Sequence, residues 1–195
     1  ISIFISYLIL KNIGYRGLFN TVLIGSALYL FFITVKDFFI KNQINLSQKI
    51  SHFGFSLFIL SVIVNGLFSS EIITNIKVGE KYSFKDGSIY FEKVNSFKEK
   101  NYISVVGTFK IKDKNNDEIF LKPELRIFNQ PLTITSEADI KTSIYSDKFL
   151  VMNLVKGNEF YNIRYQIKPF MIWIWLSTIL LVIGGLVNFL NKERK

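Results

Sequence analysis

His52 is the only histidine in this chain of 195 residues, and the chain contains no cysteine. The absence of thiols excludes disulfides, thiolate metal sites and CxxC redox pairs. Any metal or haem chemistry therefore depends on oxygen ligands or on the single imidazole of His52. The sequence also has no P-loop, GxGxxG, HExxH or G-x-S-x-G pattern, so the common signatures of nucleotide binding and hydrolysis are missing.

Two carboxylates, Glu124 and Glu137, could on paper form the acid and base of a hydrolase. Arg126 lies two positions after Glu124, and an arginine so close to a glutamate more often forms an ion pair with it. We favour a solvated or salt-bridged role for both glutamates, and the sequence predicts no catalytic residue.

Three segments without a charged residue are long enough to cross a membrane, namely residues 18–35, 50–68 and 170–190. Residues 1–10 are also uncharged, but at about 1.5 Å per residue they reach only half of a ~30 Å hydrocarbon core, so we expect the end of a cut helix. The predicted division is transmembrane helices in 1–68 (1–10, 18–35 and 50–68), a β domain in 69–168, and a last transmembrane helix with a basic tail in 169–195. Pro169 is expected in the first turn of that helix, and Trp173 and Trp175 in an interfacial aromatic belt.

The net charge of +9 is spread unevenly along the chain. Residues 69–168 hold 16 basic and 13 acidic residues, so this region is nearly balanced and nucleic acid is not expected as a partner. The loop 36–49 and the tail each carry three basic residues, whereas Lys11 and Arg16 are the two on the opposite side. The positive-inside rule therefore puts loop and tail in the cytoplasm or mitochondrial matrix, and the β domain in the periplasm or intermembrane space. We expect a multi-pass protein of the bacterial cell membrane or the mitochondrial inner membrane, in contact with membrane lipid.

The region 69–168 has the pattern of short β-strands. Asp86-Gly87 precedes an apolar run, residues 101–112 alternate with Val105, Gly107, Phe109 and Ile111 on one face, and a polar turn follows at 113–117. Further runs lie at 124–129, 148–155 and 159–167, with a short helix possible at 136–141. The predicted fold class is a multi-pass α-helical membrane protein with an inserted all-β extracytoplasmic domain, a small barrel or sandwich.

His52 lies early in the span 50–68, where an ionisable side chain usually faces a protein interior and serves a site. The positive end of the helix dipole favours the neutral imidazole, which is the form that binds a metal. Gly54, Ser51 and Ser56 are expected to leave room for a flat cofactor, and one helix face is expected to carry His52, Ser56, Ile59 and Ile63. Spacing alone leaves two possibilities open: a haem ligand, or a histidine hydrogen-bonded to a neighbouring helix.

The order of elements and several segments resemble the C-terminal part of the CcmF family, the multi-pass haem lyase component of system I cytochrome c maturation. The similar segments are ISHFGFSLFILSVIVNG, NYISVVGTFKI, LKPELRIFNQPLTITSEADI, YSDKFLVM and IRYQIKPFMIWIWLSTILLVIGGLVNFL. Pro123, Glu124 and Arg126 match a P-E-x-R element of the family, and the last span matches at Trp173, Ile174, Trp175, Gly184 and Gly185. We assign these matches to fold and packing.

The resemblance implies that His52 is an axial ligand of the iron of a membrane haem b, which is shared with another chain or with an upstream segment. It implies as partners the upstream part of the same lyase, a haem chaperone and apocytochrome c. The family's tryptophan-rich segment and outward-facing histidines have no counterpart here, so we expect a fragment or split subunit that is not active alone. The alternative is a haem-free, membrane-anchored binding or assembly module. A transporter subunit is disfavoured, because the spans lack charged residues.

Overall fold

The computed structural model describes residues 1–14, 17–40, 44–114, 117–155, 157 and 159–193. The chain divides into two compact units. The helical unit contains Ile1–Ser69, Ser143–Ser146 and Lys168–Lys195, and the β domain contains Ser70–Thr142 and Asp147–Ile167. The sequence predicts a β domain of residues 69–168, whereas the structure groups Ser69, the short loop Ser143–Ser146 and Lys168 with the helices.

The helical unit contains four helices in its described residues, and three of them are long and apolar enough to cross a membrane. The helices are α1 (Ser2–Ile13), α2 (Leu18–Phe39), α3 (Leu46–Phe68) and α4 (Met171–Glu193). Helices α2 and α3 each extend about one turn beyond the predicted charge-free segments, because polar and charged residues such as Lys36 and Lys49 continue the helices at their ends. Long basic side chains at helix ends can reach the membrane surface while the backbone stays helical.

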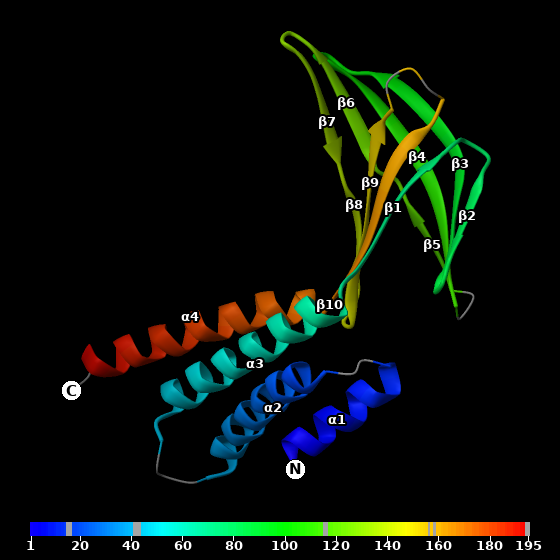
Figure 1. The fold of residues 1–195 in the computed structure, drawn as a ribbon. Coiled ribbons are helices and arrows are strands. Elements are labelled where there is room, and N and C mark those ends of the chain that lie inside the picture. Colours follow the sequence, from blue (N-terminus) through cyan, green and yellow to red (C-terminus); the bar gives the residue numbers. More distant parts are fainter. Residues whose placement is uncertain (15–16, 41–43, 115–116, 156, 158, 194–195) are drawn as a thin grey trace. The chain divides into compact units, whose positions relative to one another are not determined.

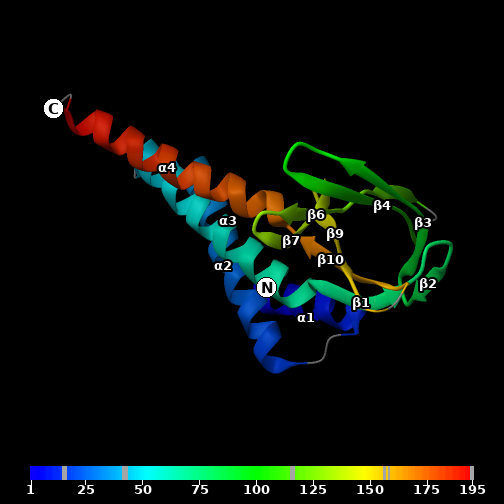
Figure 2. The ribbon, with the colours of Figure 1, turned by 90° about the horizontal axis from the view of Figure 1, so that it is seen from above.

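Helices α3 and α4 lie side by side and run antiparallel (Figures 1 and 2). Near the end of α3, the side-chain amide of Asn65 donates a hydrogen bond of 2.7 Å to the carbonyl of Pro169, just before α4. The facing surfaces carry small buried residues seven positions apart, which are Ser47, Gly54 and Ser61 on α3, and Ser177 and Gly184 on α4. Small residues let two membrane helices approach closely, so this seam explains why the pair packs along its length.

The β domain consists of two antiparallel sheets. The first has the order β1 (Ser70–Ile76), β10 (Tyr161–Pro169), β9 (Ser146–Leu154) and β8 (Asp139–Thr142). The second has the order β2 (Lys81–Phe84), β3 (Gly87–Lys98), β4 (Tyr102–Asp113), β6 (Glu124–Asn129) and β7 (Leu132–Glu137), with β5 (Glu118–Leu121) paired to β4. Seen from above, the strands surround a common interior (Figure 2).

Both sheets contribute to one hydrophobic core. Its buried side chains are Ile76, Ile89, Phe91, Phe109, Ile111, Leu121, Leu125, Leu150, Met152, Ile163 and Tyr165. The rings of Phe91 and Phe109 stack with centroids 4.1 Å apart. A Cβ atom on Gly107 would lie 2.7 Å from the Phe109 ring and 2.8 Å from the Met152 sulfur, so only glycine fits beneath these rings. The predicted alternation of β4 is confirmed for Phe109 and Ile111, which lie in the core, whereas Thr108 on the opposite face is also buried. The fold class is confirmed as apolar helices with an inserted all-β domain.

Two local predictions are wrong. Residues 136–141 lie in strands β7 and β8 instead of a short helix, because β7 pairs with β6 and β8 with β9 and these pairings outweigh local helix preference. Pro169 is the last residue of β10 and not part of the first helical turn. The chain turns at Phe170, whose φ of 59° is left-handed, and the amides of Trp173 and Ile174 donate to its carbonyl to start α4.

Candidate functional site

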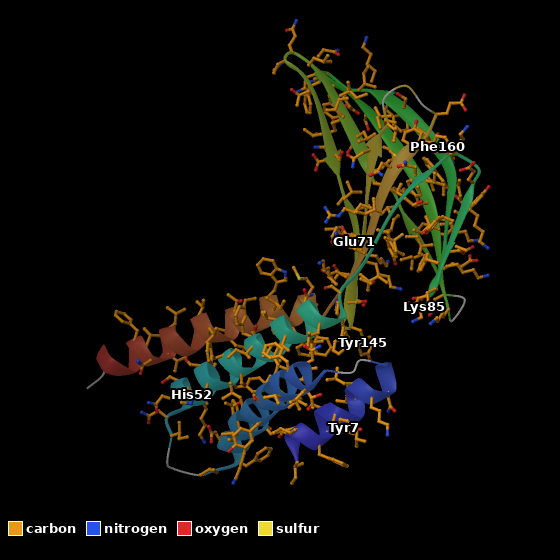
Figure 3. The ribbon with its side chains drawn as sticks, viewed as in Figure 1. Tyr7, His52, Glu71, Lys85, Tyr145 and Phe160 are labelled. Carbon is orange, nitrogen blue, oxygen red and sulfur yellow. The ribbon has the colours of Figure 1, made fainter. Side chains whose placement is uncertain are left out.

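His52 lies in the second turn of α3, seven residues into the helix (Figure 3). The first turn is closed by Gln48, whose side-chain oxygen accepts a hydrogen bond of 3.4 Å from the backbone amide of Asn45. The imidazole is exposed. Across the described ranges of the chain, no hydrogen bond or ion pair reaches it, so His52 is not used to hold these helices together.

The side of α3 that faces α2 is closed by polar and aromatic contacts. The hydroxyls of Ser56 and Thr34 are hydrogen-bonded at 2.6 Å and are both buried. The ring of Phe53 contacts those of Phe31 and Phe38, with centroids 5.6 and 5.7 Å apart. These contacts leave no room for a flat cofactor between α2 and α3 at this level.

The side of α3 that faces α4 is closed as well. A Cβ atom on Gly54 would lie 3.1 Å from the Leu180 Cβ and 3.1 Å from the backbone nitrogen of Leu181. A Cβ atom on Gly184 would lie 2.9 Å from the backbone nitrogen of Ser51. The expectation that Gly54, Ser51 and Ser56 leave space beside the imidazole is therefore wrong, because helix packing occupies all three positions.

The exposed face of α3 carries His52 together with Gln48, Phe55, Val62 and Gly66. The expected stripe of His52 and Ser56 spans two different environments, because His52 is exposed and Ser56 is buried. Positions four apart on a helix differ by about 40° around the axis, and this angle separates the exposed face from the one that packs on α2. The imidazole is thus available on a face that neither α2 nor α4 covers.

His52 could supply one ligand of a metal centre and no more. Within the described residues, no group of three or more histidine, cysteine, aspartate or glutamate side chains could hold a metal ion. A metal-containing cofactor would be held here through the His52 imidazole, with Phe55 as an apolar neighbour on the same exposed face of α3.

The carboxylate pair is brought together by the β domain, but as an ion-pair cluster. Glu124 and Glu137 are register partners on β6 and β7. The guanidinium of Arg126 lies 2.9 Å from the Glu124 carboxylate and 3.7 Å from that of Glu137. Its hydrogen bond lowers the pKa of Glu124, which is opposite to the raised pKa that a general acid requires. The salt-bridged interpretation is confirmed.

The remaining residues of the P-E-x-R element have structural roles. Pro123 is buried, and its carbonyl accepts a hydrogen bond of 3.1 Å from the amide of Gly107. Arg126 also lies over the ring of Tyr102, 5.4 Å from its centroid. The element thereby joins β4 to the start of β6.

The loop Ser143–Ser146 is connected to α4 by contacts that the sequence does not predict. The indole nitrogen of Trp173 donates a hydrogen bond of 2.9 Å to the carbonyl of Ile144. The amide of Phe170 donates one of 2.9 Å to the carbonyl of Tyr145. Two adjacent apolar residues in an otherwise polar turn, Ile144 and Tyr145, were the only signal for this contact.

Residues 67–169 match the family described as CcmF C-terminal beta-sandwich, which covers just over half of the chain. The chain belongs to the CcmF family. The cytochrome c-type biogenesis protein CcmF of Pseudomonas fluorescens is 25% identical over 146 residues, 75% of this chain and 22% of that protein. The probable cytochrome c-type biogenesis protein NrfE of Escherichia coli is 23% identical over 171 residues, 87% of this chain and 31% of that protein.

A solved structure of the cytochrome c haem lyase CcmF shares this fold, with a TM-score of 0.70 and 18% identity. The similarity covers 95% of this chain and 32% of that one. The chain therefore spans only about a fifth to a third of the relatives it matches. Family membership relates this chain to the C-terminal β-sandwich region of proteins named for cytochrome c-type biogenesis, and the solved structure supports the shared fold.

Proposed function

We propose that this chain is the C-terminal portion of a haem lyase in which His52 is an axial ligand of a membrane haem b. The observation that carries the proposal is the position of the single imidazole of the sequence. Within the described residues it makes no hydrogen bond or ion pair, and it lies on the exposed face of α3. Ionisable groups inside a membrane are costly and usually serve a site. A solved relative named as a haem lyase shares the fold.

The residues of this chain could hold a haem only at the exposed face of α3. His52 presents a ring nitrogen, and the exposed Phe55, three positions on, offers an apolar surface on the same face of α3. Helices α2 and α4 close the other sides of α3 and keep water away from its back. The bound haem would supply one-electron redox chemistry, while this chain contributes the ligand and a dry wall.

The β domain is proposed to stand on the periplasmic or intermembrane-space side of an inner membrane. The support is the excess of basic residues in the loop 36–49 and the tail over the loop that holds Lys11 and Arg16. In that position the domain would meet a haem chaperone and apocytochrome c. The thiols that bind the haem covalently would come from the cytochrome, because this chain has no cysteine. The rest of the lyase would supply the second haem ligand.

The test is the haem spectrum of the chain purified with the rest of the lyase. We expect His52→Ala to lower the haem b content by about tenfold or more, because losing even a supporting residue of a metal site costs roughly 10–100-fold in affinity. His52→Met should retain haem with a shifted spectrum, since the thioether is also an axial ligand.

Val62→Ala, farther along the same exposed face of α3, is the matched control and should keep the parental spectrum. Unchanged haem content in His52→Ala, with the complex still assembled, would refute the ligand role. A complex without any Soret band would instead support the haem-free anchoring module.

A further inference from the structure

The loop Ser143–Ser146 between β8 and β9 is part of the helical unit. Its two central carbonyls are fixed at the start of α4, by the Trp173 indole at Ile144 and the Phe170 amide at Tyr145, both at 2.9 Å. Phe170, whose amide makes the second of these bonds, has a left-handed φ of 59°. The loop is therefore attached to the first turn of a membrane-spanning helix.

The ends of the loop satisfy each other. The Ser143 amide donates 3.1 Å to the Ser146 carbonyl, and the Ser143 hydroxyl donates 2.7 Å to the same oxygen. The Ser146 amide donates 3.1 Å to the Ser143 hydroxyl. Together with the two bonds to α4, these bonds pair the amides of Ser143 and Ser146 and the carbonyls of Ile144, Tyr145 and Ser146. Pairing these groups lowers the free-energy cost of moving this part of the turn out of water.

The side chains at the tip are large, apolar and unburied. Ile144 is 61% exposed and Tyr145 is 78% exposed, while Trp175 in the first turns of α4 is 64% exposed. Figure 3 shows Tyr145 beside the helical unit. Tyrosine and tryptophan concentrate at the headgroup level of bilayers, and a membrane helix crosses that level at its first turn. Lys168, just before α4, adds a positive charge that suits lipid phosphates.

We propose that Ile144 and Tyr145 form a second membrane contact, a loop that inserts into the lipid interface of the leaflet where α4 begins. The partner is the headgroup and upper acyl region of the bilayer. Trp173 is a positioning residue, because it holds the loop at this depth through its indole hydrogen bond. The proposal needs no haem and is independent of the role of His52.

The absence of native cysteine makes a depth measurement direct. A nitroxide is attached to Tyr145→Cys in the full chain, reconstituted with the subunits that co-purify with it into phosphatidylcholine and phosphatidylglycerol nanodiscs. Collision with oxygen, which concentrates in acyl chains, is compared with collision with a water-soluble nickel chelate. Matched labels are placed at Leu132 on β7, 78% exposed, and at Ile179 in the middle of α4, 55% exposed.

The oxygen-to-nickel ratio at Tyr145 should be several-fold above that at Leu132 and below that at Ile179. Trp173→Phe, which removes the indole donor, should shift the Tyr145 ratio toward the Leu132 value and increase label mobility. A ratio equal to that at Leu132 would overturn the proposal by placing the loop in water. Low accessibility to both reagents would overturn it by showing that another protein segment covers the loop.

Discussion

At the scale of single residues, the ion pair of Asp113 and Lys148 joins the two sheets of the sandwich. The Lys148 ammonium lies 2.7 Å from the Asp113 carboxylate, and the two residues belong to β9 and β4. The Lys148 side chain is 22% exposed and that of Asp113 is 39% exposed. The hydrogen bond from Lys148 lowers the pKa of Asp113, with further help from the Lys114 amide.

We expect Asp113→Asn to lower the free energy of unfolding by about 0.5–1 kcal/mol at neutral pH, since a partly exposed pair is weakened by solvent. Because the folded-state pKa lies below the unfolded value of about 3.9, the contribution is present above that pH. It is lost as the pH falls through the folded-state pKa. Urea unfolding of the β domain in the solubilised chain should therefore show the full difference at pH 6 and a progressively smaller one as the pH is lowered below about 4.

Asp86→Asn is the control for this prediction, because Asp86 pairs with Lys114 between two turns at the ends of β3 and β4, and both side chains are more than half exposed. It should change the stability little at either pH. An equal loss in both variants would mean that the pair between the sheets has no special role.

The sequence predicts that His52 is exposed to a cofactor within a membrane helix, but it does not predict which residues surround the imidazole. Its position near the start of an apolar helix follows from the charge-free segment of residues 50–68. Which side of α3 is covered depends on how α2 and α4 pack, and a difference of about 40° between His52 and Ser56 decides between exposed and buried. The sequence of one helix does not specify which helices pack against it, so the exposed face of α3 could not be predicted.

At the scale of elements, the contact of α3 with α4 depends on small residues at a seven-residue spacing. Gly184 faces α3, where a Cβ atom would lie 2.9 Å from the Ser51 nitrogen and 3.1 Å from the Ser47 carbonyl. Gly185, its neighbour, is exposed and has no heavy atom within 4 Å of such a Cβ. The two glycines thus form a natural pair of test and control positions.

We expect Gly184→Leu to destabilise the helix pair by about 1–3 kcal/mol, the usual cost of forcing a larger side chain into a packed contact. Gly185→Leu should leave stability nearly unchanged. The measurement is the unfolding midpoint of the purified chain in a series of detergent mixtures of increasing SDS fraction. Equal unfolding midpoints for the two variants would contradict a close contact between α3 and α4 at Gly184.

Element types were largely predictable, and the errors lie where long-range pairing decides. The apolar spans and the alternating strands have strong periodic patterns that survive in any context. Residues 136–141 have a weak local preference, and pairing with β6 and β9 makes them strands. Pro169 suits either a helix start or a strand end, and only the turn at Phe170 distinguishes the two.

At the scale of the whole molecule, the β domain has its own hydrophobic core, and its first and last strands pair with each other. Among the described residues, the buried side chains of this core all lie between Ile76 and Tyr165. Its first strand, β1, pairs with its last, β10, so that Ser70 faces Ile167. A domain with a complete core and adjoining ends has the features of an independent folding unit.

We therefore expect residues 70–167, carrying Ile144→Ser and Tyr145→Ser to remove the exposed apolar tip, to be soluble and to unfold cooperatively in urea. The measurement is circular dichroism together with urea titration. A fragment of residues 70–160 is the control and should fail to fold, because β1 and β9 both lose β10. Aggregation of the longer fragment, or cooperative unfolding of the shorter one, would contradict this view.

The pairing of β1 with β10 also sets an order of events during synthesis. About 85 residues separate the end of β1 from the start of β10. At roughly 5–20 residues per second, β1 waits about 4–17 s before its partner is made. Throughout that interval α3 is already available to the membrane while the first sheet lacks its second strand. The growing chain must therefore pass through a stage with an open strand edge, which ends only as the residues leading into α4 emerge.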